Sequence, residues 1–111
     1  METDLNHATL TGTLERDPIV RFADHGTQQV SFTLRLTEAG PAGQKFKLYL
    51  PCECYSGVAE QAGELSAGAA VLVAGKLKWT SYTAKDSTKK TILAVLARLV
   101  KVLVSATVAA E

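Results

Sequence analysis

Two neighbouring segments of the chain alternate strictly between apolar and polar side chains, which is the period of a β-strand with one buried face. In residues 29–37 every second side chain, beginning with Val30, is apolar. In residues 46–55 the apolar positions begin with Phe46 and Leu48 and end with two cysteines. A Gly-Pro-Ala-Gly loop separates the two segments. The pattern predicts two strands, each with a core face and a polar face, and it places Phe46 and Leu48 in the core.

Three further segments carry weaker strand patterns. Residues 5–14 alternate loosely, Gly12 interrupts them where a barrel strand must bend, and Asp17-Pro18 ends the strand because proline cannot donate to a β-ladder. Residues 71–78 are apolar on both sides at first and basic on one side later. Residues 91–104 fit either a helix or a strand, and we favour a strand because four strands would leave a small barrel open.

One segment changes period. In residues 56–67 apolar side chains recur at helical spacing from Val58 to Leu65, with Ser56 as the expected N-cap and Gly68 as the left-handed residue past the end. The polar residues 81–90 are expected to form a hairpin tip. The resulting order predicts an all-β chain, a five-stranded OB-fold Greek-key barrel with one short helix between strands 3 and 4.

The length of 111 residues suits a single domain, which we expect to span residues 1–104, followed by a short loose tail at 105–111. The formal net charge of +1 does not by itself predict a nucleic-acid-binding protein. The cations are instead concentrated locally. In residues 76–90 five lysines accompany a single acid, Asp86.

The sequence contains few residues that could form a catalytic or metal site. Cys52 and Cys54 are two apart in an alternating strand, which predicts that both thiols fill the core, and no other cysteine completes a zinc site. No nucleophile–base set, supported carboxylate pair or phosphate-binding glycine loop can be assembled. We therefore expect a binding protein without enzymatic activity, metal or cofactor.

The N-terminus and the longest apolar run indicate where in the cell the protein is expected. Residues 1–4 are acidic and no apolar segment follows them, so a secretory signal is not expected. Residues 92–104 are interrupted by Arg98 and Lys101 and are too short to span a bilayer. These observations predict a cytoplasmic, nucleoid-associated protein with no membrane partner.

Three stretches carry a resemblance to a known family. The first joins Asn6, Gly12, Asp17-Pro18, Val20-Arg21 and Gly26 at fixed spacings. The second is Tyr55-Ser56-Gly57-Val58-Ala59-Glu60, and the third is Val73-Ala74-Gly75-Lys76-Leu77-Lys78. Together they resemble the bacterial single-stranded DNA-binding proteins, which have an OB-fold, over residues 5–104.

The resemblance implies sequence-tolerant binding of single-stranded DNA in DNA replication, recombination and repair, by stacking of bases on aromatic rings and by phosphate contacts. It puts the family's stacking positions on Tyr49, Tyr55 and Tyr82 and its basic strand position on Lys78. Arg21 and Thr33 match positions of the family directly, and Arg35 shares the strand face of Thr33. The predicted nucleic-acid-binding residues are Arg21, Thr33, Arg35, Lys47, Tyr49, Tyr55, Lys76, Lys78, Trp79 and Tyr82.

Each of these residues also has a purely structural interpretation. Tyr49 and Tyr55 could cover a sheet face or lie in a subunit interface, where tyrosine is common. Trp79 shares a strand face with Leu77, which favours the core or an interface. The lysines of residues 76–90 could be solvated charges that keep a sheet edge from aggregating.

The chain departs from the family at two places. Pro51 and Glu53 occupy the binding face where the family often has a cation, and we expect Glu53 to repel phosphate. Residues 105–111 lack the linker and acidic tail that recruit replication and repair proteins, so this would be a domain-length member or one that has lost that recruitment.

These departures leave other functions open. The main alternative is an accessory factor of replication restart similar to primosomal replication protein N, which binds DNA weakly and contacts a helicase. An RNA-binding module is another, because stacking platforms tolerate either sugar. The expected partners are single-stranded DNA, replication or repair proteins, and further copies of the chain in a homodimer or homotetramer paired along the first strand.

Overall fold

The computed structural model describes residues 4–23 and 25–105, and the rest of the tail predicted at 105–111 lies outside that part of the chain. One sheet holds the strands in the order β1-β5-β6-β4-β3-β2, and β1 also pairs with β3. The elements along the described chain are β1 (Ala8–Leu14), β2 (Ile19–Phe22), β3 (Gln28–Ala39), β4 (Lys45–Tyr55), α1 (Ser56–Gly63), β5 (Ala70–Thr83) and β6 (Lys89–Val104).

The sheet closes on itself to form a five-stranded barrel. β1 and β2 both pair antiparallel with β3 and are two parts of one barrel strand, interrupted at residues 15–18 where Asp17-Pro18 lies. β4 pairs with β6 in parallel, which completes the wall. With the helix inserted between β4 and β5, this is the predicted OB-fold.

Gly12 lies where β1 approaches β3 most closely. A Cβ atom at this position would lie 2.7 Å from the carbonyl oxygen of Arg35 and 2.9 Å from Cγ of Leu34. The next two residues of β1 pair with Arg35 and Leu34, which closes the barrel. A glycine is therefore needed where the first strand bends onto the third.

The core lies inside the barrel and under α1. Both cysteines are free and buried there, as predicted. Burial raises the pKa of Cys52 to about 12 and that of Cys54 to about 11, so both thiols stay protonated. The core cluster consists of Leu14, Val30, Phe32, Leu34, Cys52, Cys54, Ala59, Ala62, Ala69, Val71, Val73, Val95, Ala97 and Val100.

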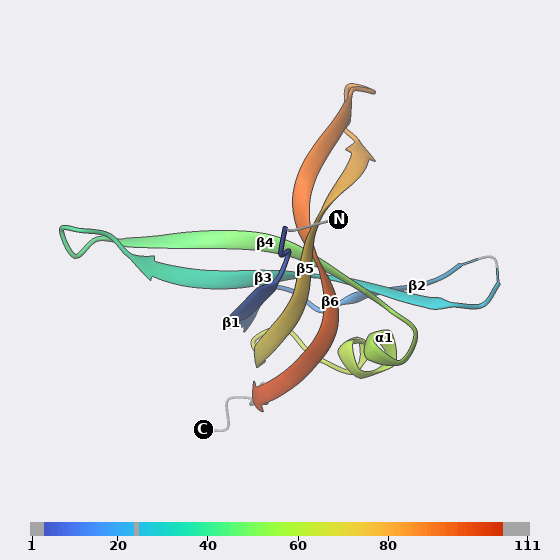
Figure 1. The fold of residues 1–111 in the computed structure, drawn as a ribbon, viewed down its shortest axis with the longest axis horizontal. Helices are drawn as coiled ribbons and strands as arrows, with labels where there is room; N and C mark the ends of the chain where they lie inside the picture. Colours follow the sequence, from blue (N-terminus) through green and yellow to red (C-terminus); the bar gives the residue numbers. More distant parts are fainter. Residues whose placement is uncertain (1–3, 24, 106–111) are drawn as a thin grey trace.

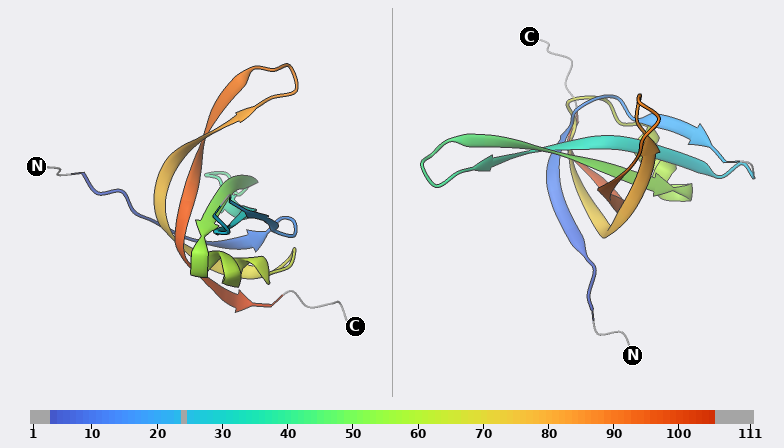
Figure 2. Two further views of the ribbon diagram at one scale, coloured as in Figure 1. Left: turned by 90° about the vertical axis from the view of Figure 1, so that its right-hand side faces the viewer. Right: turned by 90° about the horizontal axis from the view of Figure 1, so that it is seen from above.

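Two hairpins extend beyond the barrel in different directions (Figure 1, Figure 2). The β3–β4 ladder continues to Ala39 and Lys45, well past the core. Phe46 and Leu48 lie on this extension and are exposed. The prediction that they belong to the core is wrong, because the alternation continues where no barrel interior lies beneath it.

The β5–β6 hairpin confirms the strand interpretation of the last apolar run. β6 pairs with β5 over its whole length, from Lys89 to Val104. The polar tip is shorter than predicted, since β5 continues to Thr83 and only residues 84–88 connect the strands. Within residues 4–23 and 25–105 no helix has the length and hydropathy required to cross a membrane.

The helix is shorter than predicted. α1 ends at Gly63, and its N-cap is Tyr55, without a side-chain hydrogen bond. Ser56 is the first helical residue, with a φ of 58°, and does not cap the helix as predicted. Gly68 has the expected positive φ of 92°, but it belongs to the turn before β5, where its N–H donates to the carbonyl of Leu14.

Candidate nucleic-acid interface

The polar faces of β3 and β4 form one continuous outer surface. Residues directly opposite each other in an antiparallel ladder point to the same side of the sheet. Thr33 lies opposite Pro51, and Arg35 lies opposite Tyr49. The further pairs on this face, which we call the β3–β4 outer face, are Gln29 with Tyr55, Ser31 with Glu53, and Thr37 with Lys47.

Two tyrosines present their rings on the β3–β4 outer face. Tyr49 is 50% exposed and Tyr55 is 40% exposed. They are six residues apart on β4, so they lie on the same side and roughly 20 Å apart along the strand. Flat, exposed rings at intervals on a sheet are the platforms on which unpaired bases stack.

Glu53 lies between these tyrosines and is only 9% exposed. Its Oε1 atom accepts a hydrogen bond from the Tyr55 hydroxyl at 3.2 Å and one from the Lys78 ammonium, also at 3.2 Å. The acid is therefore paired and largely withdrawn from solvent. Glu53 is an ion-paired acid, and the expectation that it repels phosphate stays a prediction.

The pKa values of Glu53 and Tyr55 reflect these contacts. Burial by itself would raise the pKa of Glu53, but hydrogen bonds from Lys78, Thr80 and Tyr55 and the charge of Lys78 together lower it. The pKa of Tyr55 is raised by burial and by the charge and hydrogen bond of Glu53. At neutral pH Glu53 is thus a carboxylate and Tyr55 a neutral phenol.

The free cations lie toward the two ends of the β3–β4 outer face. Arg21, on β2, lies opposite Gln29 and is exposed. Lys47 is exposed on the extended hairpin opposite Thr37. Among residues 4–23 and 25–105 neither side chain has an ion-pair partner, so both charges are available to phosphates.

Two other predicted cations are less accessible. Arg35 donates from Nη1 to Glu15 at 3.0 Å, a pair that ties β3 to the residue following β1. Lys76 is half-buried opposite Leu96. Thr33 lies on the outer face as predicted, half-buried between the strands that flank it.

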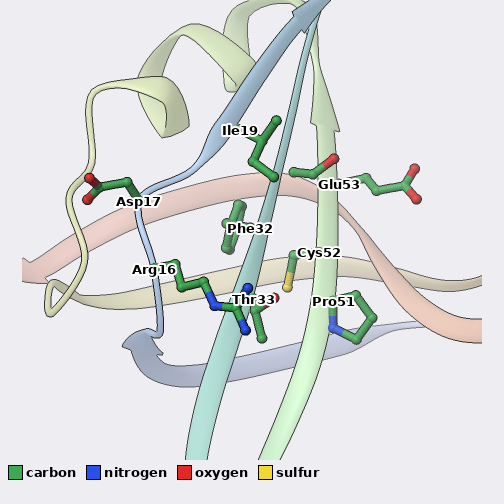
Figure 3. A pocket seen from close by; sticks show the side chains of 9 residues that line it. Arg16, Asp17, Ile19, Phe32, Thr33, Pro51, Cys52 and Glu53 are labelled. Carbon is green, nitrogen blue, oxygen red and sulfur yellow. The ribbon is translucent and has the colours of Figure 1, made fainter. Parts of the chain in front are cut away.

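A hollow of about 180 Å³ opens beside Thr33. In Figure 3, Arg16 extends toward Thr33, while the carboxylate of Glu53 points away from both. Ile19 and Pro51 supply apolar walls. Arg16 is not among the residues predicted from the sequence, because it belongs to no strand. Its position next to the Asp17-Pro18 break was the one sequence signal that it lies beside this face.

Trp79 and Tyr82 lie on the extended β5–β6 hairpin. Trp79 is 68% exposed, so it does not lie in the core, and its alternative place in an interface stays a prediction. Tyr82 is an even number of residues from Lys78 and shares its side of the strand, whereas Trp79 points to the other side. The structure therefore brings Tyr82 and Lys78 onto one face and leaves Trp79 off it.

The closed barrel is an OB-fold, and its outer face carries exposed aromatic rings and cations, which are the features that nucleic-acid-binding OB-fold domains use. The sequence matches the Single-strand binding protein family over residues 5–103. The chain therefore belongs to that family, as the resemblance implied. Within the part of the chain that the structure describes, no three His, Cys, Asp or Glu side chains gather as metal ligands would.

Individual relatives agree with the family match. A single-stranded DNA-binding protein of Mycobacterium leprae is 33% identical over 94 residues, covering 78% of this chain and 56% of that protein. One from Mycolicibacterium smegmatis is 31% identical over 94 residues, covering 78% of this chain and 57% of that protein. One from Thermus aquaticus is 31% identical over 87 residues, covering 78% of this chain and 33% of that protein. The matched region thus spans about half, or less, of the length of these curated relatives.

Proposed function

We propose that this chain binds single-stranded DNA, without sequence preference and without enzymatic activity, on the β3–β4 outer face. Bases stack on Tyr49 and Tyr55, and phosphates contact Arg21 and Lys47. The proposed cellular role is that of the family, coating unpaired strands in DNA replication, recombination and repair in the cytoplasm.

The observation that carries this proposal is the common direction of the two tyrosines. Tyr49 and Tyr55 are exposed on one side of one strand, and the exposed cations Arg21 and Lys47 lie on the same outer face. A sequence-tolerant binder needs this combination, because every base has a flat face and every nucleotide has a phosphate. The family match and the relatives' descriptions favour this function over that of the accessory factor.

The test is a titration with oligo-dT, oligo-U and duplex DNA at several salt concentrations, followed by intrinsic fluorescence. We expect oligo-dT to bind most tightly, with a log–log salt slope of about −0.7 for each phosphate contacted. Binding to oligo-dT that disappears near physiological salt would support the accessory factor instead. Equal or stronger binding to oligo-U would support an RNA-binding module.

Tyr55→Ala tests the stacking platform directly and should weaken oligo-dT binding by about 1–3 kcal/mol. Phe22→Ala is a matched control, because Phe22 is also exposed but lies on the side of β2 opposite to Arg21. An unchanged affinity for Tyr55→Ala would assign that ring a structural role.

We also propose that the chain assembles into a homodimer or homotetramer. Residues 8–12 of β1 pair with β5 but with no other described strand, which leaves one edge open. The end of β6 exposes large apolar side chains that a partner subunit could cover; they are Leu99, Val102, Leu103 and Val104. Light scattering after gel filtration tests this proposal, and a monomer at micromolar concentration would contradict it.

A further inference from the structure

A nearly buried acid at the centre of a DNA-binding face requires an explanation. Burying a carboxylate is costly unless hydrogen bonds and an opposite charge satisfy it. Glu53 is satisfied in this way, and its partners Tyr55 and Lys78 are residues that the sequence places at the interface. The acid is thus connected to the residues expected to touch DNA.

The contacts of Glu53 join side chains from strands that are not neighbours. Tyr55 is two residues away on β4, whereas Lys78 belongs to β5, and β6 lies between these strands. Lys78 crosses β6 beside Ala94, its partner in the β5–β6 ladder, which is completely buried although it lies outside the core cluster. A small side chain at position 94 therefore leaves room for the lysine to reach Glu53.

We propose that Glu53 is a positioning residue of the single-stranded DNA interface, and that it holds the Tyr55 ring and the Lys78 ammonium side by side as a receptor for one base and a neighbouring phosphate. This inference rests on the proposed function. An anchored hydroxyl restricts the rotation of the Tyr55 ring before DNA arrives, which lowers the entropy lost on binding. The lysine ammonium has three donors, so two remain for phosphate oxygens while one donates to Glu53.

This role and simple repulsion predict opposite effects of mutation. If Glu53 only repelled phosphate, removing its charge would strengthen DNA binding. If it positions Tyr55 and Lys78, Glu53→Val should weaken oligo-dT binding about fivefold to tenfold, the factor expected from the loss of one ordinary hydrogen bond. Glu53→Gln should restore most of the affinity, because its amide oxygen accepts from the same donors.

A double-mutant cycle identifies the partner. Tyr55→Phe keeps the stacking ring and loses only the hydroxyl that donates to Glu53. Glu53→Val combined with Tyr55→Phe should weaken binding less than the two single effects multiplied together, because both changes break the same contact. Glu38→Gln is the control for net charge, since Glu38 is exposed on the opposite side of the same ladder.

A second readout needs no DNA. In a Tyr49→Phe/Tyr82→Phe background, Tyr55 is the only remaining tyrosine, and its ionisation can be followed by ultraviolet absorbance. Glu53→Gln should lower the pKa of Tyr55 toward its ordinary value, because the neighbouring negative charge is removed. An acid that merely stabilised the fold without touching Tyr55 would leave this titration unchanged.

The outcomes separate the inference from the proposed function. Wild-type protein that does not bind oligo-dT overturns the proposed function and the inference with it. If the wild type binds oligo-dT and both Glu53→Val and Glu53→Gln bind it more tightly, only the inference is overturned. The acid then acts by repelling phosphate. Unchanged affinity in Glu53→Val, measured on protein shown to be folded by circular dichroism, also overturns the inference.

Discussion

Gly75 of β5 lies directly against the backbone of Leu96 in β6. A Cβ atom at position 75 would collide with the carbonyl oxygen of Leu96. The β5–β6 register shifts next to this glycine, between Ala74 and Gly75. The glycine thus allows β5 and β6 to approach closely within the barrel wall, where Leu96 also pairs with Glu53 of β4.

Gly75→Ala should therefore destabilise the protein by about 1–3 kcal/mol, because the backbone must move to admit the methyl group. Urea denaturation measures the change. Gly57→Ala is the matched control, since a Cβ at that helical position would meet no other described part of the chain within 4 Å. Equal stability of the two variants would show that the β5–β6 ladder adjusts without strain.

Asn6 should anchor the segment before β1. Its side chain donates to the carbonyl of Leu77 at 2.8 Å and accepts from the Leu77 N–H at 2.9 Å, in the manner of a paired strand residue. Asn6→Ala should cost about 1 kcal/mol and speed hydrogen exchange at the Leu77 amide. Asn6→Asp keeps the acceptor oxygen, so the Leu77 amide should exchange more slowly in this variant than in Asn6→Ala. Identical exchange in the wild type and both variants would contradict the anchoring role.

Arg21 and Lys47 should each contribute to the salt dependence of DNA binding. Both are exposed, and neither has an ion-pair partner among residues 4–23 and 25–105. Replacing either with Gln should make the log–log salt slope for oligo-dT shallower by about 0.7, because one fewer phosphate is neutralised. Lys101→Gln, an exposed change on β6 opposite Leu72, should leave the slope unaltered. A slope that responds equally to all three changes would indicate diffuse attraction rather than a defined face.

The stability of the fold should depend on the charge of Glu53 at acidic pH. Its pKa in the folded protein is lower than the ordinary value of 4.5, so the carboxylate stabilises the fold above that pH. This contribution is lost as the pH falls through the lowered value. Urea midpoints from neutral pH to about pH 3 should therefore fall less steeply in Glu53→Gln than in the wild type. Parallel curves for the two proteins would mean that Glu53 gains no net stabilisation from its partners.

Local patterns in the sequence predicted the strands well. The alternation around Val30 and the proline break after Asp17 depend only on neighbouring residues, and both correspond to the observed elements. The valines of residues 91–104 correctly favoured a strand. The helix boundary was less predictable, because α1 ends at Gly63 although its apolar spacing continues to Leu65.

The sequence predicted which side chains share a face of each strand, but not whether that face is covered by the rest of the protein. Phe46 continues the spacing of buried residues and is nevertheless exposed, and Trp79 follows the spacing of Val73 and is exposed as well. The two hairpins are longer than the barrel wall, so their inner faces have nothing to pack against (Figure 1). Strand length alone does not reveal where the barrel ends.

The sequence by itself determined the order of the elements, the family and the strand face that carries Tyr49 and Tyr55, because side-chain alternation and short motifs are local properties of a chain. Only the tertiary structure decided that Glu53 meets Lys78. These residues are 25 positions apart and lie on strands separated by β6, so their contact depends on the closure of the barrel. That closure changes an acid expected to repel DNA into a paired group at the centre of the proposed interface.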